Sequence, residues 1–413
     1  MDAYIQYLNN LVNQSKDEFK NLGNINWINP WNSQEYETLK AALIKKACAA
    51  PLFHGTKPYL NSISGGCQLC GEGKWSCLFI TGLCNAKCFY CPTAQNQDDA
   101  PQSQGLTFET PESYAEYINH FKFSGVSFSG GEPLLKAEKV LQYLSSIRKN
   151  CKPNIYTWMY TNGILANDAI FDRLAAAGLN EVRFDIGATN YNLSKINHAV
   201  GRIPVVTIEI PAIPESKEAI MELLPQMSKM GVQHLNLHQL RLTPYNAKHL
   251  LKRNYTYIPA ERPIVAESEI AALEIITYAK SQNIDIGINY CSFFFKHRFQ
   301  KASFRKLVAQ STSNPREFIT QNGYIRTLSD DAVRYEKIAI YDTERTQTNA
   351  TAVPLLLKHK NYTLTRSLHE NIPTNKMHSQ SVNTLLLKIP EQIPSDSDLF
   401  RIWQCEYIEQ GLR

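Results

Sequence analysis

The chain has 413 residues, 43% hydrophobic and 20% charged, the composition of an ordinary globular protein large enough for one barrel-sized domain with appendages. Its 43 basic and 38 acidic residues give a formal net charge of +5, which permits an anionic partner without demanding one, because nucleic-acid-binding domains usually carry clustered basic stripes. The start lacks a signal-peptide layout, and no apolar segment reaches the roughly 18 residues that span a bilayer. We therefore expect a cytoplasmic protein with no membrane or nucleic-acid partner, whose ten cysteines are metal ligands rather than disulfides.

Residues 1–64 are predicted to form a helical N-terminal cap. Apolar residues recur at helical spacing over 5–12 and again over 35–49. Nothing in this region carries evident chemistry, so we expect it to cover a larger domain or to form one wall of a substrate site.

A cysteine-rich segment follows at residues 67–77. Cys67 and Cys70 form a C-x2-C pair before a glycine-rich turn, a pattern typical of a metal knuckle. We predict a second metal site for zinc, iron or an auxiliary iron–sulfur cluster. Its expected ligands are Cys67, Cys70, Cys77 and Cys291. Two alternatives stay open: Cys77 as an inert buried thiol, and Cys48 in place of Cys291.

Three further cysteines, Cys84, Cys88 and Cys91, stand at C-x3-C-x2-C spacing directly after an apolar run. Thiolates crowded into one loop can all bind a single iron–sulfur cube. Three ligands for four irons leave one iron without a thiolate, and an open position distinguishes a catalytic metal site from a closed structural one. Tyr90 can lie beside the cluster and against a purine ring. The alternative is a zinc site completed by a residue elsewhere.

Strand-like and helix-like runs alternate between residues 65 and 300, which predicts an α/β fold, a partial (β/α)6-type TIM barrel. The expected strands are 77–82, 125–129, 154–160, 181–186, 205–210, 233–239 and 284–289. The expected helices lie near 111–122, 136–149, 167–178, 217–230 and 266–282. Pro111 and Asn167 suit helix starts, and Gly178 and Gly231 suit helix ends. In such barrels chemistry gathers at the C-terminal ends of the strands.

Several predicted strands end in residues that suit a bound ligand. Paired glycines allow close backbone approach, a glutamate supplies a fixed charge, and small polar side chains can bond a carboxylate or a ribose. These residues are Gly130, Gly131, Glu132, Thr161 and Asn162. Arg183 and Asp185 share one face of a strand, where they could meet a ligand carboxylate and ribose or form an internal salt bridge. Asn236 and His238 share a face of another strand and are candidates for substrate contact.

Residues 301–413 change character and are predicted to form a small C-terminal appendage, helical first and then β-rich. Short alternating runs at 337–341, 354–358 and 384–389 indicate strands. We expect this part to serve substrate recognition or scaffolding.

Residues 65–300 resemble the radical S-adenosylmethionine (radical SAM) superfamily, and within it a group described as related to the pyruvate formate-lyase activating enzyme. The matching motifs are the C-x2-C pair, T-G-L-C-N-x-x-C-F-Y-C-P at 81–92, G-G-E-P-L-L at 130–135, E-I-P-A-I-P at 209–214 and the Cys291 segment. The resemblance implies a [4Fe-4S] cluster on Cys84, Cys88 and Cys91 whose open iron binds SAM. It implies SAM contacts from the G-G-E motif, Tyr90 beside the adenine, and an adenine wall near Ile208 and Glu209.

The same resemblance implies an oxygen-sensitive enzyme that cleaves SAM reductively to a 5′-deoxyadenosyl radical, which abstracts hydrogen from a peptide, protein or small metabolite. A flavodoxin or ferredoxin would donate the electron. The substrate and the reaction class stay open, since Cys77 is an extra thiol and the segment 236–239 stands where a more acidic one is expected. Activation of a glycyl-radical enzyme is less favoured, because the additional N- and C-terminal parts are larger than that task requires. The rival hypothesis is a non-catalytic metal-binding module for RNA, using the second cysteine site and the basic stretch 296–306.

Overall fold

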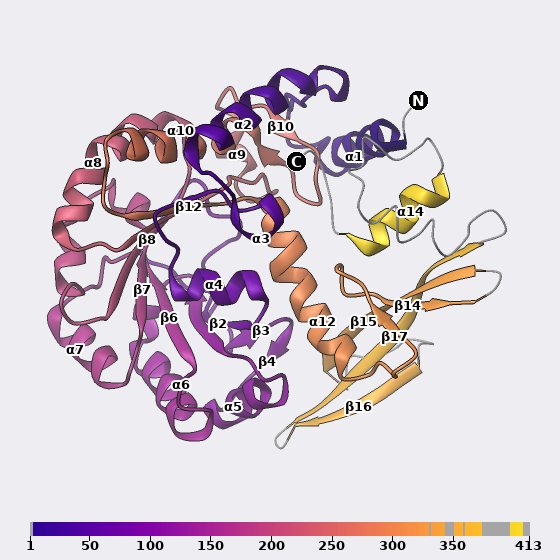
Figure 1. Ribbon diagram of the computed structural model, residues 1–413. Coiled ribbons are helices and arrows are strands. Elements are labelled where there is room, and N and C mark those ends of the chain that lie inside the picture. The colour runs from indigo at the N-terminus through magenta and orange to yellow at the C-terminus, as the bar shows by residue number, and fades with distance from the viewer. Residues whose placement is uncertain (1–2, 330–331, 343–350, 358–359, 374–396, 408–413) are drawn as a thin grey trace.

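The computed structural model describes residues 3–329, 332–342, 351–357, 360–373 and 397–407, and its centre is a sheet of parallel strands (Figure 1). In spatial order these strands are β12 (Gly287–Cys291), β9 (His234–His238), β8 (Val205–Pro211), β7 (Glu181–Phe184), β6 (Tyr156–Thr161), β5 (Gly125–Gly130) and β2 (Trp75–Thr81). One edge is extended by β1 (Tyr59–Leu60), and the other by β3 (Gln102–Ser103) and β4 (Leu106–Thr107). The two edges do not pair with each other, so the predicted partial barrel is confirmed.

Helices cover the outer face of this sheet (Figure 1). They are α5 (Pro111–His120), α6 (Ala137–Asn150), α7 (Asp168–Ala176), α8 (Lys217–Met230) and α10 (Ala266–Ser281). The main hydrophobic core lies between these helices and the outward strand residues, such as Leu78 and Ile80, which are fully buried. The predicted helix signals operate as expected: Asn167 caps α7 through its side chain, and Gly231 ends α8 at φ +90°.

The predicted parallel strands match their observed spans to within two residues, except for the last one. The last parallel strand, expected at 284–289, runs from Gly287 to Cys291. Asn283 turns with φ +50° after α10, and register with β9 begins only where Gly287 faces His234. Cys291, an expected metal ligand, is therefore the last residue of β12.

A short helix, α4 (Gly65–Glu72), lies inside the barrel at the N-terminal ends of the strands (Figure 1). Ser64 caps it by accepting a hydrogen bond from the Cys67 amide at 3.2 Å. The C-x2-C pair therefore lies on a helix rather than in a loop knuckle, and the glycine-rich turn serves to end that helix, with Gly73 at φ +71°.

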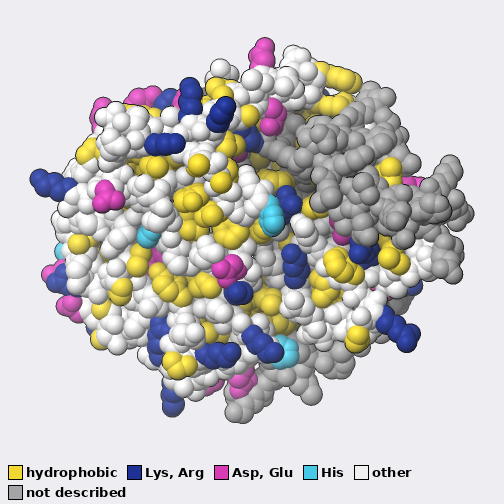
Figure 2. All heavy atoms as spheres, viewed as in Figure 1, with side chains coloured by type: hydrophobic (Ala, Val, Ile, Leu, Met, Phe, Trp, Pro, Cys, Tyr) yellow, Lys and Arg dark blue, Asp and Glu magenta, His cyan; other side chains and the backbone are white. Residues whose placement is uncertain are grey.

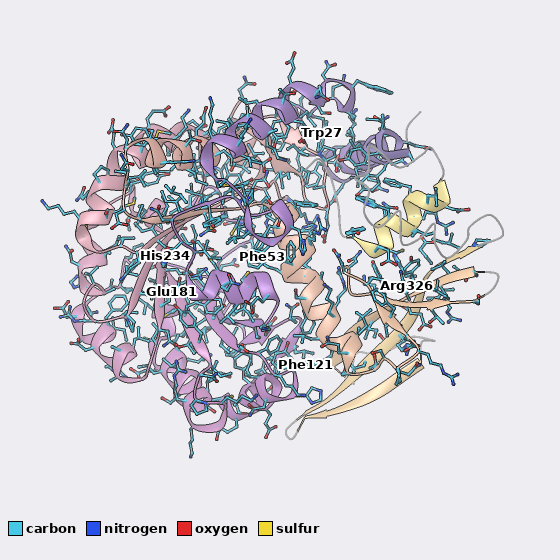
Figure 3. All side chains as sticks on the ribbon, in the orientation of Figure 1. Trp27, Phe53, Phe121, Glu181, His234 and Arg326 are labelled. Carbon is cyan, nitrogen blue, oxygen red and sulfur yellow. The ribbon has the colours of Figure 1, made fainter. Side chains whose placement is uncertain are left out.

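The barrel interior is polar, in contrast to the outer core. Arg183 donates from Nε to Glu181 at 2.8 Å, from Nη1 to Glu209 at 2.7 Å and from Nη2 to the Ser64 hydroxyl at 3.0 Å. Thr207 adds a bond to Glu181 at 2.8 Å. Figure 3 shows Glu181 within the barrel, beside α4. Because each charge has a partner of opposite sign or a hydrogen bond, burial of this network is tolerated.

The N-terminal helices and the C-terminal part of the chain lie along one side of the barrel (Figure 1). The N-terminal part contains α1 (Ala3–Phe19), α2 (Ser33–Ala47) and α3 (Leu52–Gly55), together with the single turn η1 (Pro30–Asn32). Short elements in the loops are η2 (Pro133–Lys136), η3 (Ile186–Thr189), η4 (Ser194–His198), η5 (Pro214–Ser216), α9 (Ala247–Leu250), β10 (Tyr257–Ile258) and β11 (Ile264–Val265). After β12 come α11 (Phe293–Phe295), the π-helical η6 (Lys296–Lys301) and α12 (Ala302–Gln310). The expected boundary at 300/301 falls inside this continuous helical run.

The C-terminal part is an antiparallel sheet with one helix, α14 (Ser397–Glu406). Its strands, in the order β13-β14-β15-β17-β16, are β13 (Phe318–Ile319), β14 (Ile325–Leu328), β15 (Ala332–Asp342), β17 (Lys360–Pro373) and β16 (Thr351–Leu357). The strands expected at 337–341 and 354–358 fall on β15 and β16, and the one expected at 384–389 lies outside the described residues. None of the helices in the described ranges is both long and apolar enough to cross a bilayer.

Gly66→Ala should destabilise the protein. An added Cβ would lie 2.4 Å from Arg183 Nη2, and two carboxylates hold that guanidinium in place. Overpacking of this kind costs about 1–3 kcal/mol, although alanine is the better helix former. Urea denaturation should show a lowered midpoint. Gln68→Ala, on the exposed side of the same helix, is the control and should change the unfolding free energy by less than about 0.5 kcal/mol; equal effects would contradict the argument.

Candidate functional site

The loop after β2 places Cys84, Cys88 and Cys91 on the wall of a cavity of about 420 Å³ at the C-terminal ends of the strands. The Ala86 amide lies 3.4 Å from Cys84 Sγ, and Gln95 Nε2 donates to Cys91 Sγ at 3.1 Å. The hydrogen bond between Cys91 and Cys88 lowers the pKa of Cys88 and raises that of Cys91, and burial raises the pKa of Cys84. N–H donors around partly exposed thiols stabilise the thiolate form, so the three residues suit an iron–sulfur cluster.

The cysteines are not gathered around one point as they stand. Within the described residues, no group of three or more His, Cys, Asp or Glu side chains is arranged to hold a metal ion. The fit of this loop to a cluster therefore rests on its three thiols, their hydrogen-bond donors and the cavity beside them.

Paired glycines bring the end of β5 against the cysteine loop. The Gly131 amide donates to Thr81 O at 2.8 Å, and the Glu132 amide donates to Leu83 O at 2.7 Å. A Cβ on Gly131 would lie 2.0 Å from Leu83 O, so a side chain is excluded there. Gly130 and Gly131 both line the cavity, where their backbone can approach a ligand closely.

Glu132 has a different place from the one expected. Its carboxylate is fully buried and does not line the cavity. It accepts bonds from the Thr161 hydroxyl at 2.8 Å, the Asn162 amide at 2.7 Å and the Leu134 amide at 2.9 Å. Burial raises the pKa of Glu132, while these bonds oppose the shift. Glu132 is thus a positioning residue that fixes the ends of β5 and β6, and Asn162 and Thr161 line the cavity in front of it.

Tyr90 connects the cysteine loop to the end of β7. Its hydroxyl donates to the Asp185 carboxylate, 2.8 and 2.9 Å from the two oxygens. Burial raises the pKa of Asp185 to about 6, and the bond from Tyr90 restrains the rise. Asn246 Nδ2 donates to Tyr90 O at 3.2 Å and so holds the loop from the other side. Tyr90 and Asp185 both line the cavity, as expected for residues beside a nucleoside.

Arg183 and Asp185 share a cavity but do not pair. Arg183 is occupied by Glu181 and Glu209, so an internal salt bridge forms with other partners than the one considered from the sequence. Glu209 lines the cavity, whereas Ile208 lies on the opposite face of β8 in the outer core. Strand alternation explains this split.

Asn236 and His238 do share the inward face of β9. Asn236 is buried behind the cavity and donates to Glu209 at 3.0 Å, whereas His238 lines it. Burial, with the nearby charge of Lys296, lowers the pKa of His238 to about 3, so its imidazole is neutral at physiological pH.

The sequence analysis missed several cavity residues. Arg241, Gln239 and Phe293 line it without belonging to any predicted motif, and Lys296 was assigned only to a basic stretch. Arg241 and Lys296 flank the Phe293 ring, at 5.4 and 4.9 Å from its centroid. No sequence signal marks these residues, because only the path of the chain after each strand brings them to the cavity.

The expected second cysteine site is brought together in part. Cys67 on α4 and Cys291 at the end of β12 both lie beside Asn289, 3.9 Å from its Nδ2 and 3.5 Å from its Oδ1, and Cys70 is one turn from Cys67. Cys77 is separate: it faces Ser127 and Ser129 of β5. Cys48 is also separate and bonds to Ile44 O of its own helix. The structure thus groups three of the four expected ligands.

A larger cavity, about 900 Å³, lies between α1, η6 and the C-terminal sheet and is lined by none of the cysteines of the 84–91 loop. Helix η6 separates the two cavities, because Lys296 faces the smaller one and His297 and Lys301 face the larger one. We locate the chemistry in the smaller cavity, since only there do thiols, glycines and the Tyr90–Asp185 pair converge.

A parallel barrel with three thiols and a glycine turn around a cavity at the strand ends has the architecture of a cofactor-dependent enzyme. Residues 78–227 match the model of the Radical SAM superfamily. This part of the chain therefore carries a radical SAM domain, which identifies an enzyme of the radical SAM class.

Several known proteins are similar to parts of this chain. A protein of Methanocaldococcus jannaschii, named as a candidate glycyl-radical enzyme activating enzyme, is 28% identical over 277 residues, 64% of this chain and 72% of its own. GTP 3′,8-cyclase of Desulforamulus reducens is 25% identical over 202 residues, 48% of this chain and 60% of its own. Among solved structures, Streptococcus suis SuiB bound to S-adenosylmethionine aligns with 78% of this chain and 70% of its own, at 15% identity and a TM-score of 0.40.

Glu132→Gln should lower stability and weaken SAM binding together. The new amide would direct an NH2 group at the Asn162 amide, leaving two buried donors opposed, which costs about 1–3 kcal/mol. Thermal unfolding and anaerobic SAM titration measure the two effects. Glu138→Gln makes the same exchange in an exposed pair with Arg173 and should leave both nearly unchanged. Normal SAM affinity in Glu132→Gln would show that the carboxylate does not position the site.

Proposed function

We propose that this chain cleaves SAM reductively at a [4Fe-4S] cluster held by Cys84, Cys88 and Cys91. The bound cofactors would supply one electron and a 5′-deoxyadenosyl radical, which takes a hydrogen atom from the substrate while methionine is released. One observation carries the proposal: three thiols with N–H donors share a single cavity with the Gly130–Gly131 turn. A flavodoxin or ferredoxin in the cytoplasm would supply the electron.

The residues that line the cavity divide it into two ends. In this proposal Gly130, Gly131 and Asn162 bind the amino-acid part of SAM near the cysteine loop, and Tyr90 with Asp185 binds the nucleoside. Arg183 holds Glu209 in place rather than meeting the SAM carboxylate, because two carboxylates already occupy its guanidinium.

We infer that the substrate carries an anionic group, bound at the part of the cavity wall formed by Lys296 and Arg241. Neither of these side chains forms an ion pair with a carboxylate among the described residues. Lys296 is partly buried, and burial lowers its pKa. Paired cations without counter-ions in a partly desolvated cavity favour phosphate or carboxylate. An anionic metabolite fits this end; the C-terminal sheet, beside the larger cavity, would contribute to substrate recognition.

An RNA-binding module is the second hypothesis, and the contacts of the 296–306 stretch disfavour it. Lys296 faces the cavity, His297 is buried, and Arg305 donates to Asn322 O at 2.9 Å. The stretch is therefore not an exposed basic face. On the face drawn in Figure 2, lysine and arginine side chains are scattered among other types rather than joined in one stripe.

SAM cleavage is tested under anaerobic conditions. The reconstituted protein with SAM and a strong reductant should form 5′-deoxyadenosine, and Cys88→Ser should form none, because the cluster loses a ligand. Cys151→Ser is the control, since this thiol bonds only to Ala115 O outside the barrel and its loss should leave the rate within about twofold. Intact SAM with a fully loaded cluster would overturn the proposal.

The anionic end is tested by isothermal titration with inorganic pyrophosphate and with citrate. Lys296→Met should weaken binding of the better probe about tenfold, the loss of one charge-assisted contact. Lys301→Met removes a lysine of the same helix that faces the other cavity and pairs with Glu261, so it should bind as the unaltered chain does. If neither probe binds, or if both variants weaken binding equally, the substrate assignment is wrong.

A further inference from the structure

Two cysteines of α4 and a third at the end of β12, more than 200 positions later, lie around a lysine inside the barrel. Cys67 and Cys70 lie one turn apart on α4, so both face the same side of that helix, and Cys291 ends β12. Lys57, fully buried, donates from Nζ to Cys291 Sγ at 2.5 Å. Lys57 lies just before β1, which pairs with β12 and so fixes the lysine beside Cys291.

The charge of Lys57 is compensated by sulfur alone. Among the described residues no carboxylate forms an ion pair with it, and its other close neighbour is the Phe295 ring, 4.4 Å from Nζ. A buried ammonium without a counter-charge costs several kcal/mol, and negative charge on the neighbouring sulfurs would offset that cost.

Each of the three sulfurs also has a nitrogen donor. Gln300 Nε2, from η6, donates to Cys70 Sγ at 2.6 Å. Asn289 Nδ2 lies 3.9 Å from Cys67 Sγ, and Lys57 Nζ donates to Cys291 Sγ. Inert buried cysteines pack as small hydrophobic residues and need no such donors. Donors to sulfur are the usual second layer around thiolates that bind metal.

We propose that Cys67, Cys70 and Cys291 bind a second metal centre, zinc or an iron–sulfur cluster, whose charge Lys57 neutralises. Three thiolates around Zn²⁺, or around a [4Fe-4S] core of charge +2, leave a net charge of about −1. One ammonium cancels it, which makes the buried assembly neutral. The three sulfurs are not arranged around a common point among the described residues, so metal binding would have to draw them together, as at the 84–91 loop.

This centre lies beside the cavity that holds the 84–91 loop. Cys291 and His238 face each other across β12 and β9, and His238 lines that cavity. A centre with three thiolates keeps a fourth position for a non-thiolate ligand, which is the property of a catalytic rather than a structural metal site.

The test uses the full chain with Cys84, Cys88 and Cys91 all changed to Ser, so that the first cluster cannot form. After anaerobic reconstitution with iron and sulfide, or with zinc, mass spectrometry and sulfide analysis give metal per chain. We expect about one zinc or about four irons with matching sulfide. Adding Cys67→Ser and Cys291→Ser should remove at least nine-tenths of that metal. Adding Cys77→Ser and Cys151→Ser instead, the matched control, should leave it in place.

The proposal is overturned if the folded triple variant binds neither metal, or if loss of Cys67 and Cys291 leaves the metal content unchanged. Should the triple variant not fold, the same comparison is made in the unaltered chain, where Cys67→Ser with Cys291→Ser must lose one zinc or one cluster's iron. Lys57→Met should weaken metal binding about tenfold, the usual effect of losing a second-layer partner. These readouts do not depend on the formation of 5′-deoxyadenosine. The proposal of this metal site and the proposal of SAM cleavage can therefore be refuted separately.

Discussion

The buried guanidinium of Arg183 determines how the barrel interior is built. It bonds to Glu181 on its own strand, to Glu209 on β8 and to Ser64 at the start of α4, and it lies against the Trp158 and Tyr160 rings, 5.1 and 5.5 Å from their centroids. A charge in such a place is tolerated only when every partner is present. Three strands and the inner helix are therefore locked to one another, and Gly66 is the position where α4 comes closest.

A chain of hydrogen bonds extends from this guanidinium across the interior. Glu209 accepts from Asn236, and Asn236 accepts from Asn289, which reaches the Cys67 sulfur. The polar chain divides the interior into a cavity that opens at the C-terminal strand ends and a thiol group on the α4 side. The two metal-binding candidates are thus neighbours with a common wall, yet each has its own ligands and hydrogen-bond donors.

The sequence predicts what depends on local pattern and misses what depends on distant partners. Hydrophobic alternation located the strands, and caps such as Asn167 and Gly231 located helix ends, because both act within a few residues. The cavity position of Asn162 followed from the rule on strand ends. Lys57 escaped notice, because its partner Cys291 lies 234 positions away. The assignment of Ile208 to the adenine wall could have been avoided. Thr207 and Glu209 flank it, so strand alternation already assigned Ile208 to the outer face.

The pairing of β1 with β12 also bears on how the protein is made. Tyr59 faces Asn289, about 230 residues later in the chain. At about 5–20 residues per second, a ribosome takes roughly 10–50 s to synthesise that interval. During this time Cys67 and Cys70 exist on the nascent chain without Cys291 and without the strand that fixes Lys57. The group of three thiols is thus complete only after β12, the last parallel strand, has been synthesised. Until then Cys67 and Cys70 are open to oxidation or to binding of a wrong metal.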